Sequence, residues 1–179
     1  MNIYCTNKLE KLIGKKLMAE EPEPVGPLGN WNANLFSLNG RKCLMVINDV
    51  TYYPIILLDI LKKDIVNFHQ CFHTRLMHQL YFDKITVPES CRPKLEAACE
   101  PRFLKTNNNR KALGTINSLT YELEANFYEG FGGILDPIIE PELNNKLTST
   151  LVGALKPKQF DYGVPLKEMD KFIQNTCKD

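Results

Sequence analysis

Two short apolar runs, Asn32 to Leu38 and Arg41 to Ile47, are separated only by Asn39-Gly40. Asn-Gly between two apolar runs is the strongest short-range signal of a β-hairpin, because both residues accept the positive φ angles of its turn. A third run, Tyr52 to Leu58, follows another turn and predicts the last strand of an antiparallel meander. Pro54 within this run indicates that the strand lies at a sheet edge or carries a bulge.

A longer periodicity, with apolar residues recurring every three or four positions, predicts helices elsewhere in the chain. It is clearest over Lys62 to Phe82 and from Asn109 to about Tyr128. Further predicted helices are Leu9 to Met18, Pro88 to Cys99, Pro141 to Val152 and Pro165 to Thr176, and further predicted strands are Asn2 to Thr6 and Arg102 to Lys105.

These elements predict an α+β fold with a mainly antiparallel sheet and with helices packed on one face. The sheet would contain the N-terminal strand, the three-stranded meander and the short later strand. A chain of 179 residues suits a single domain, residues 1–179. We also predict a loop rich in proline and glycine near residues 20–30, and a C-terminal helical extension from about residue 156.

The charged residues nearly balance, with a formal net charge of +1, so the molecule has no overall field that attracts nucleic acid or a membrane. Nucleic-acid binding would therefore need a local basic patch. The sequence shows neither a secretory signal nor the roughly 20 consecutive apolar residues of a membrane span. These features predict a cytoplasmic protein without membrane contact, and they leave the oligomeric state open.

Six cysteines are spread along the chain without a C-x-x-C pair. Because disulfides are rare in a reducing cytoplasm, we interpret all six as free thiols. Cys5 and Cys43 fall within predicted strands and are expected to be small core residues.

Three histidines and Cys71 cluster near the middle of the chain, but their helical positions argue against a metal site. His69 and His73 share one side of the predicted helix, whereas His78 and Cys71 project from the opposite side. We therefore expect no metal and no cofactor, with His69 buried and hydrogen-bonded. No G-x-S-x-G or paired-carboxylate pattern is present, so catalytic residues remain unassigned and enzymatic activity uncertain.

The segment from Lys105 to Gly114 places three asparagines, then Arg110 and Lys111, where a helix is predicted to begin. Asn107 to Asn109 suit the cap, because their side chains accept hydrogen bonds from exposed backbone N–H groups. Cations are unfavourable in a first helical turn, which already carries partial positive charge. An external anion, phosphate above all, would offset this charge and accept from the N–H groups.

The predicted anion site also includes residues on one side of the same helix. At 100° per residue, Asn117 and Tyr121 fall in the sector of Arg110, and Lys105 ends the preceding strand nearby. The candidate binding residues are Lys105, Asn109, Arg110, Lys111, Asn117 and Tyr121.

A structural interpretation of Arg110 competes with the anion site. Arg110 could pair with an acid such as Glu122 or Glu124, with a loop carboxylate, or point into solvent. No glycine spacing typical of a phosphate-binding loop is present in this segment.

Four stretches of the sequence together resemble one protein family. They are I-Y-C-T-N-K-L from Ile3, W-N-A-N-L-F-S-L-N-G-R-K-C-L-M-V-I-N-D from Trp31, F-L-K-T-N-N-N-R-K-A-L-G-T-I-N-S from Phe103 and L-N-N-K-L-T-S-T-L-V-G-A-L from Leu143. This family of small, uncharacterised bacterial and archaeal proteins is known only as a domain of unknown function. The resemblance implies an intracellular prokaryotic protein linked with plasmids, phages or other mobile elements. The family has no known activity that could be assigned to this chain. Similar sequences carry small or aliphatic residues at Lys111, which makes it the weaker member of the site.

We therefore expect an intracellular, non-enzymatic binding or regulatory protein that recognises nucleic acid or a nucleotide phosphate at this basic helix start. One alternative is a protein–protein interaction module, inhibitor-like or antitoxin-like, that uses the exposed edge of the meander or an apolar helix. A less favoured alternative is an enzyme acting on a phosphate-bearing substrate, with Arg110 stabilising developing charge.

Overall fold

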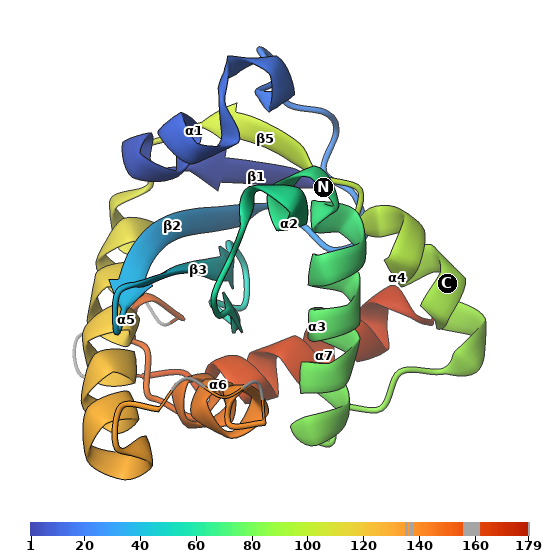
Figure 1. Cartoon of the computed structure of the whole chain (residues 1–179). Coiled ribbons are helices and arrows are strands. Elements are labelled where there is room, and N and C mark those ends of the chain that lie inside the picture. The colour runs from blue at the N-terminus through green and yellow to red at the C-terminus, as the bar shows by residue number, and fades with distance from the viewer. Residues whose placement is uncertain (135, 137, 156–161, 179) are drawn as a thin grey trace.

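A five-stranded sheet in the order β4-β3-β2-β1-β5 lies at the centre of the computed structural model, which describes residues 1–134, 136, 138–155 and 162–178 (Figure 1). The strands are β1 (Asn2–Cys5), β2 (Trp31–Leu38), β3 (Arg41–Asn48), β4 (Pro54–Leu57) and β5 (Arg102–Lys105). The described helices are α1 (Asn7–Ile13), α2 (Lys62–Val66), α3 (Phe68–Phe82), α4 (Arg92–Ala98), α5 (Arg110–Phe131), α6 (Glu140–Thr148) and α7 (Pro165–Thr176). Three 3-10 turns are also described: η1 (Lys15–Leu17), η2 (Glu89–Cys91) and η3 (Gly153–Leu155).

The predicted meander is present. Strands β2 and β3 pair along their full length, from Trp31 opposite Asn48 to Leu38 opposite Arg41. Asn39 and Gly40 adopt φ angles of 46° and 74°, which is the left-handed conformation that favours this dipeptide in a tight turn. Strand β4 begins at Pro54 and lies at one end of the sheet order, as the proline predicted.

The sheet is mixed rather than mainly antiparallel, so this part of the fold prediction is wrong. Strand β1 lies between β2 and β5 and is parallel to both. Parallel neighbours are joined by long crossovers rather than tight turns. The chain passes through α1 and the proline-rich loop between β1 and β2, and no local pattern in these segments records the direction of pairing.

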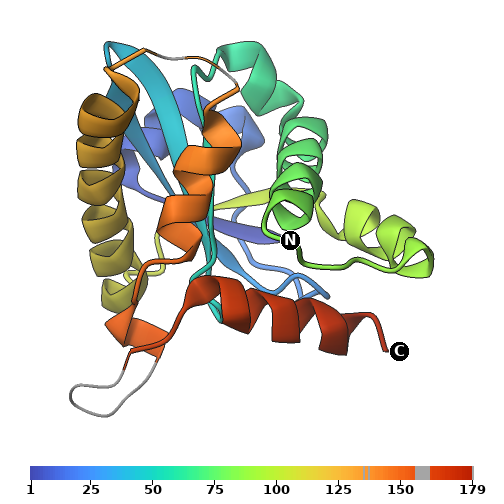
Figure 2. The same ribbon diagram turned by 90° about the horizontal axis from the view of Figure 1, so that it is seen from below.

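Helices cover both faces of the sheet, which corrects the prediction that they pack on one face. Figure 2 shows α5 and α3 on opposite sides of the strands. One apolar core joins residues of α1, α3, α4 and α7 to one face, and a second joins α5 and α6 to the other. In β3, Leu44 and Val46 are buried in the first core, while Met45 and Ile47 are buried in the second. A continuous apolar run of this kind is typical of a strand covered on both sides.

The long helix predicted over Lys62 to Phe82 is divided in two. Asn67 has non-helical backbone angles, φ −100° and ψ 29°, and separates α2 from α3. Helix α5 has the predicted start and ends at Gly132, which adopts a left-handed conformation that suits a helix C-cap. The predicted C-terminal extension begins at about residue 156, and residues 156–161 lie outside the described residues. Beyond them, Met169 and Ile173 of α7 are fully buried in the first core.

The prediction of six free thiols is wrong for one pair. Cys91 and Cys177 form a disulfide that joins η2 to the end of α7, with Cα atoms 5.5 Å apart. Their separation of 86 positions gives no sequence signal of proximity. The other four cysteines are free, and Cys5 and Cys43 are buried in strands as predicted. Among the described helices, none is long and apolar enough to cross a membrane.

Candidate functional site

Helix α5 begins as the sequence predicted. Asn109 is the N-cap, and its side-chain oxygen accepts a hydrogen bond from the backbone N–H of Ala112 at 3.2 Å. Arg110 and Lys111 are exposed and line a hollow of about 470 Å³ between the first turns of α5 and the segment 150–154. Within the described part of the chain, neither cation forms an ion pair, so the postulated pairing of Arg110 with Glu122 or Glu124 is not observed there.

The six candidate residues do not all line one hollow. Lys105 lines a different hollow, together with Glu10 and Glu20. Asn117 and Tyr121 are exposed and do not line the Arg110 hollow. That hollow does contain Glu122, whose carboxylate accepts a hydrogen bond from the Thr150 hydroxyl at 2.6 Å. The start of α5 therefore presents two cations, but the carboxylate of Glu122 reduces the positive potential of the hollow that they line.

A second basic surface was not predicted from the sequence. It is a hollow of about 560 Å³ between α1, α2 and the neighbouring strands, and we call it the lysine groove. Four exposed lysines line it: Lys8 and Lys11 from α1, Lys42 from β3 and Lys62 from α2. Helices α1 and α2 contact each other, which brings lysines from distant parts of the chain to one opening.

The remaining lining of the lysine groove is aliphatic. It comprises Leu12, Ile13, Gly14, Leu17, Leu35, Ile65 and Val66. Ile13 and Ile65 belong to the core, whereas Leu17 and Val66 are 43% and 70% exposed. The groove therefore combines a partly exposed apolar surface with four positive charges.

Among the described residues, no carboxylate lines the lysine groove, and the acids of the adjoining segments, Asp59 and Asp64, lie outside its lining. Asp64 accepts a hydrogen bond from the backbone N–H of Leu61 at 2.8 Å. Asp59 forms an ion pair with Arg41 at 3.2 Å. Four like charges gathered at one hollow raise the local potential above that of a nearly neutral molecule, and the negative charge that Asp64 retains lowers it in part.

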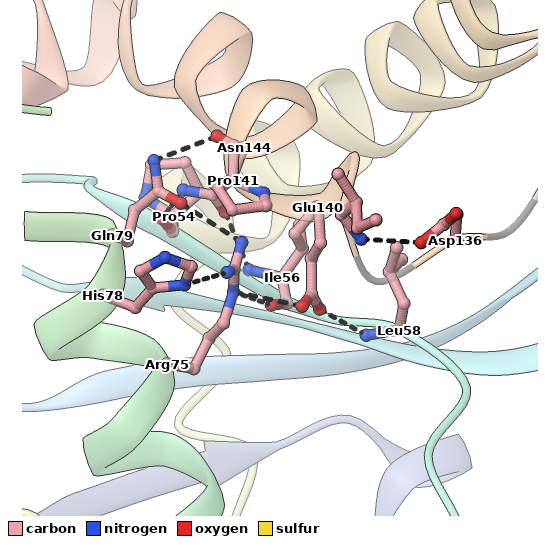
Figure 3. A network of polar contacts seen from close by, with 11 residues as sticks. Pro54, Ile56, Leu58, Arg75, His78, Gln79, Asp136, Glu140, Pro141 and Asn144 are labelled. Carbon is pink, nitrogen blue, oxygen red and sulfur yellow. Dashed lines mark hydrogen bonds and ion pairs between the residues drawn. The ribbon is translucent and has the colours of Figure 1, made fainter. Parts of the chain in front are cut away.

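A largely buried ion pair lies at the edge of the sheet, beside β4 (Figure 3). Arg75 of α3 is 3.5 Å from Glu140 of α6, measured from Nε to Oε2, and both side chains are largely buried. Arg75 also donates to the carbonyl of Ile56 at 3.3 Å and to the side chain of Gln79 at 3.2 Å. Burial raises the pKa of Glu140 and lowers that of Arg75, and each is partly offset by its charged partner.

These side chains occupy the backbone hydrogen-bonding groups of β4. Glu140 accepts from the N–H of Leu58 at 2.9 Å, and Asn144 both accepts from the N–H of Ile56 and donates to the carbonyl of Pro54. Arg75 also donates to the carbonyl of Ile56. The outward backbone N–H and C=O groups along β4 are therefore already hydrogen-bonded and cannot pair with another strand. The exposed meander edge that we expected as an interaction surface is therefore covered.

The same polar network continues towards the buried Tyr53. Its hydroxyl donates to Asp83 at 2.6 Å, and Asp83 also accepts from Gln79 and Asn145. Burial and the adjacent Asp83 carboxylate raise the pKa of Tyr53 well above its usual range. These hydrogen bonds join α3, α6 and the segment before β4, so we assign the network to structure.

The histidines do not converge on a metal. His69 is about one-third exposed rather than fully buried, and its ring nitrogens contact the carbonyl of Glu96 and the carboxylate of Glu100 at 2.9 and 3.1 Å. His78 instead lies beside Arg75, with Nδ1 3.5 Å from the guanidinium. Within the residues that the structure describes, no group of three or more histidine, cysteine, aspartate or glutamate side chains could hold a metal ion.

Comparison with known proteins gives one match. A family model described as "Domain of unknown function (DUF6933)" matches residues 2–168. No curated protein and no solved structure matches the chain. The functional argument therefore depends on the surface chemistry described above.

Proposed function

Because the chain belongs to the DUF6933 family, whose function is undefined, we propose from its own surface that it is a binding protein with an anionic partner. The lysine groove is the proposed contact surface. The observation that carries this proposal is that four lysines from three elements line one hollow to which none of the described carboxylates contributes.

The charge arrangement supports binding rather than a purely structural role. Each exposed ammonium group is well hydrated, so the lysines contribute little to folding stability. Their mutual repulsion is unfavourable at low ionic strength, and a bound anion would relieve it.

The start of α5, which the sequence favoured, ranks second as a contact surface. It presents two cations instead of four, and Glu122 shares its hollow. The two surfaces can be separated experimentally, because each carries a pair of exposed cations that can be neutralised without touching the core.

The test compares two double variants with equal charge change. Lys8→Gln with Lys11→Gln alters the groove, and Arg110→Gln with Lys111→Gln is the matched control. Binding to inorganic polyphosphate, oligodeoxythymidine and polyglutamate is measured by titration at several salt concentrations. We expect the groove variant to lose about ten-fold or more in affinity for at least one polyanion, while the control stays near wild type.

Four outcomes contradict the proposal. Equal losses in both variants would show that only net charge matters, and a loss confined to the control would assign binding to the start of α5. Absence of polyanion binding by the wild-type protein at low salt would remove the proposed function altogether. Affinity that does not fall with salt would also contradict an electrostatic contact.

A further inference from the structure

We infer that the lysine groove binds an acidic amphipathic segment of another protein, one that carries carboxylates beside a row of aliphatic side chains. This inference rests on the proposed function and specifies its partner. The two features that the partner must match are the aliphatic lining and the lysine rim of the same hollow.

The apolar lining requires a partner with apolar side chains. Leu17 and Val66 stay substantially exposed at the groove, and Leu12 and Leu35 lie beside them. Water contact with such side chains is unfavourable, and an aliphatic ligand surface would remove it. A ligand that offers only negative charge would leave these aliphatic side chains in contact with water.

The lysines set the charge of the partner and its position. Lys8 and Lys11 are three residues apart on α1, so their side chains are neighbours on the surface of the helix. Lys62 and Lys42 complete the rim from α2 and β3. Lysine stems are apolar and can extend the aliphatic surface while their ammonium groups remain in water near the partner's carboxylates.

The residue types argue against nucleic acid at this surface. Single-stranded nucleic acid is bound by aromatic side chains that stack on bases, and none of the described residues that line the groove is aromatic. None of them is arginine, which contacts phosphate through two parallel hydrogen bonds. An amphipathic helix with aliphatic side chains three or four residues apart matches both the aliphatic lining and the lysine rim of the groove.

The test uses four probes with the full-length protein. The first is a peptide of about 15 residues with leucines on one helical face and glutamates on the other, a length near the lower limit for helix formation in water. The second is a peptide of identical composition whose order abolishes the apolar face. An oligodeoxythymidine and vesicles containing anionic phosphatidylglycerol are the third and fourth. Fluorescence anisotropy measures the three soluble probes, and co-sedimentation measures the vesicles.

We expect the amphipathic peptide to bind about ten-fold or more tightly than its reordered counterpart and than the oligonucleotide. Val66→Ser should weaken the amphipathic peptide by about ten-fold, because it removes one exposed apolar contact. The same change should leave the reordered peptide and oligonucleotide unaffected. Circular dichroism checks that this surface variant is folded.

Other results overturn the inference in distinguishable ways. Equal binding of the two peptides, or no effect of Val66→Ser, excludes an apolar contribution. Preferred binding of the oligonucleotide or of vesicles assigns a different partner but preserves anion recognition at the groove. Failure of all four probes to bind at low salt removes the proposed function together with this inference.

Discussion

Arg75 Nε and Glu140 Oε2 lie 3.5 Å apart and, besides facing each other, both side chains hydrogen-bond to the edge strand β4. Arg75 binds the carbonyl of Ile56, and Glu140 binds the N–H of Leu58. The pair therefore neutralises buried charge and protects the sheet edge at once. Removal of either partner would leave a charge and a backbone group without their contacts.

We predict that Glu140→Ala lowers the free energy of unfolding by about 3–5 kcal/mol, the range for breaking one side of a buried ion pair. Glu140→Gln should cost less, because its amide oxygen can still accept from the N–H of Leu58. Urea denaturation followed by circular dichroism gives both values. A loss below about 0.5 kcal/mol for Glu140→Ala, the range of ordinary surface changes, would contradict the assigned role.

The half-buried carboxyl of Asp49 predicts a pH dependence of stability. Burial raises its pKa above the usual 3.8. The folded protein therefore holds this proton more tightly than the unfolded chain does, and the contribution of Asp49 to stability falls as pH rises through the raised pKa. Asp49→Asn retains an oxygen that can accept from Asn32 but carries no charge.

We therefore expect the stability of Asp49→Asn relative to wild type to rise from about pH 4 upward and then level off, because only the wild-type side chain ionises. Denaturant midpoints measured between pH 3.5 and 7.5 test this expectation. Asp170→Asn, at an exposed position of α7, is the control and should track the wild type. A constant difference across the pH range would contradict the prediction for Asp49.

The sequence predicted those elements whose signals are local. Asn39-Gly40 defined the hairpin, and Asn109 marked the start of α5. Turn conformation and capping depend on a few consecutive residues, so they can be predicted without the rest of the fold. The parallel pairing of β1 depends on contacts between distant segments and left no comparable pattern.

The lysine groove was missed for a similar reason. Lys8, Lys42 and Lys62 belong to three separate elements, and each alone resembles an ordinary solvated lysine. Helical geometry relates residues only within one helix, so it could not show how the α5 candidates are divided between hollows. It gave no indication that Lys105 lines another hollow, or that the segment 150–154 and Glu122 share the hollow of Arg110.

Arg110 gives a direct test of whether the start of α5 is optimised for stability. We predict that Arg110→Glu raises the free energy of unfolding by about 0.3–1 kcal/mol, because an acid in the first turn interacts favourably with the helix dipole. Arg110→Gln should give about half that gain, and high salt should reduce both effects. Thermal and urea denaturation at low and high ionic strength provide the values. A loss of stability in Arg110→Glu would instead assign Arg110 a structural contact.

The disulfide between Cys91 and Cys177 predicts a redox dependence of stability. It links residues 86 positions apart and holds the end of α7 against η2. Reduction restores conformational freedom to the unfolded chain, so we expect a loss of about 2–4 kcal/mol in the free energy of unfolding. Urea denaturation of the wild-type protein with and without dithiothreitol measures this loss.

Matched variants isolate the contribution of that bond. Cys91→Ser with Cys177→Ser should show the reduced stability of the wild type under both redox conditions, whereas Cys71→Ser should retain the wild-type response because Cys71 is a free thiol. Alkylation in denaturant without reductant should label four cysteines, as only four are free. Two results together would show that the bond does not form. All six cysteines would be labelled in protein kept under oxidising conditions, and the denaturation curves with and without dithiothreitol would superimpose.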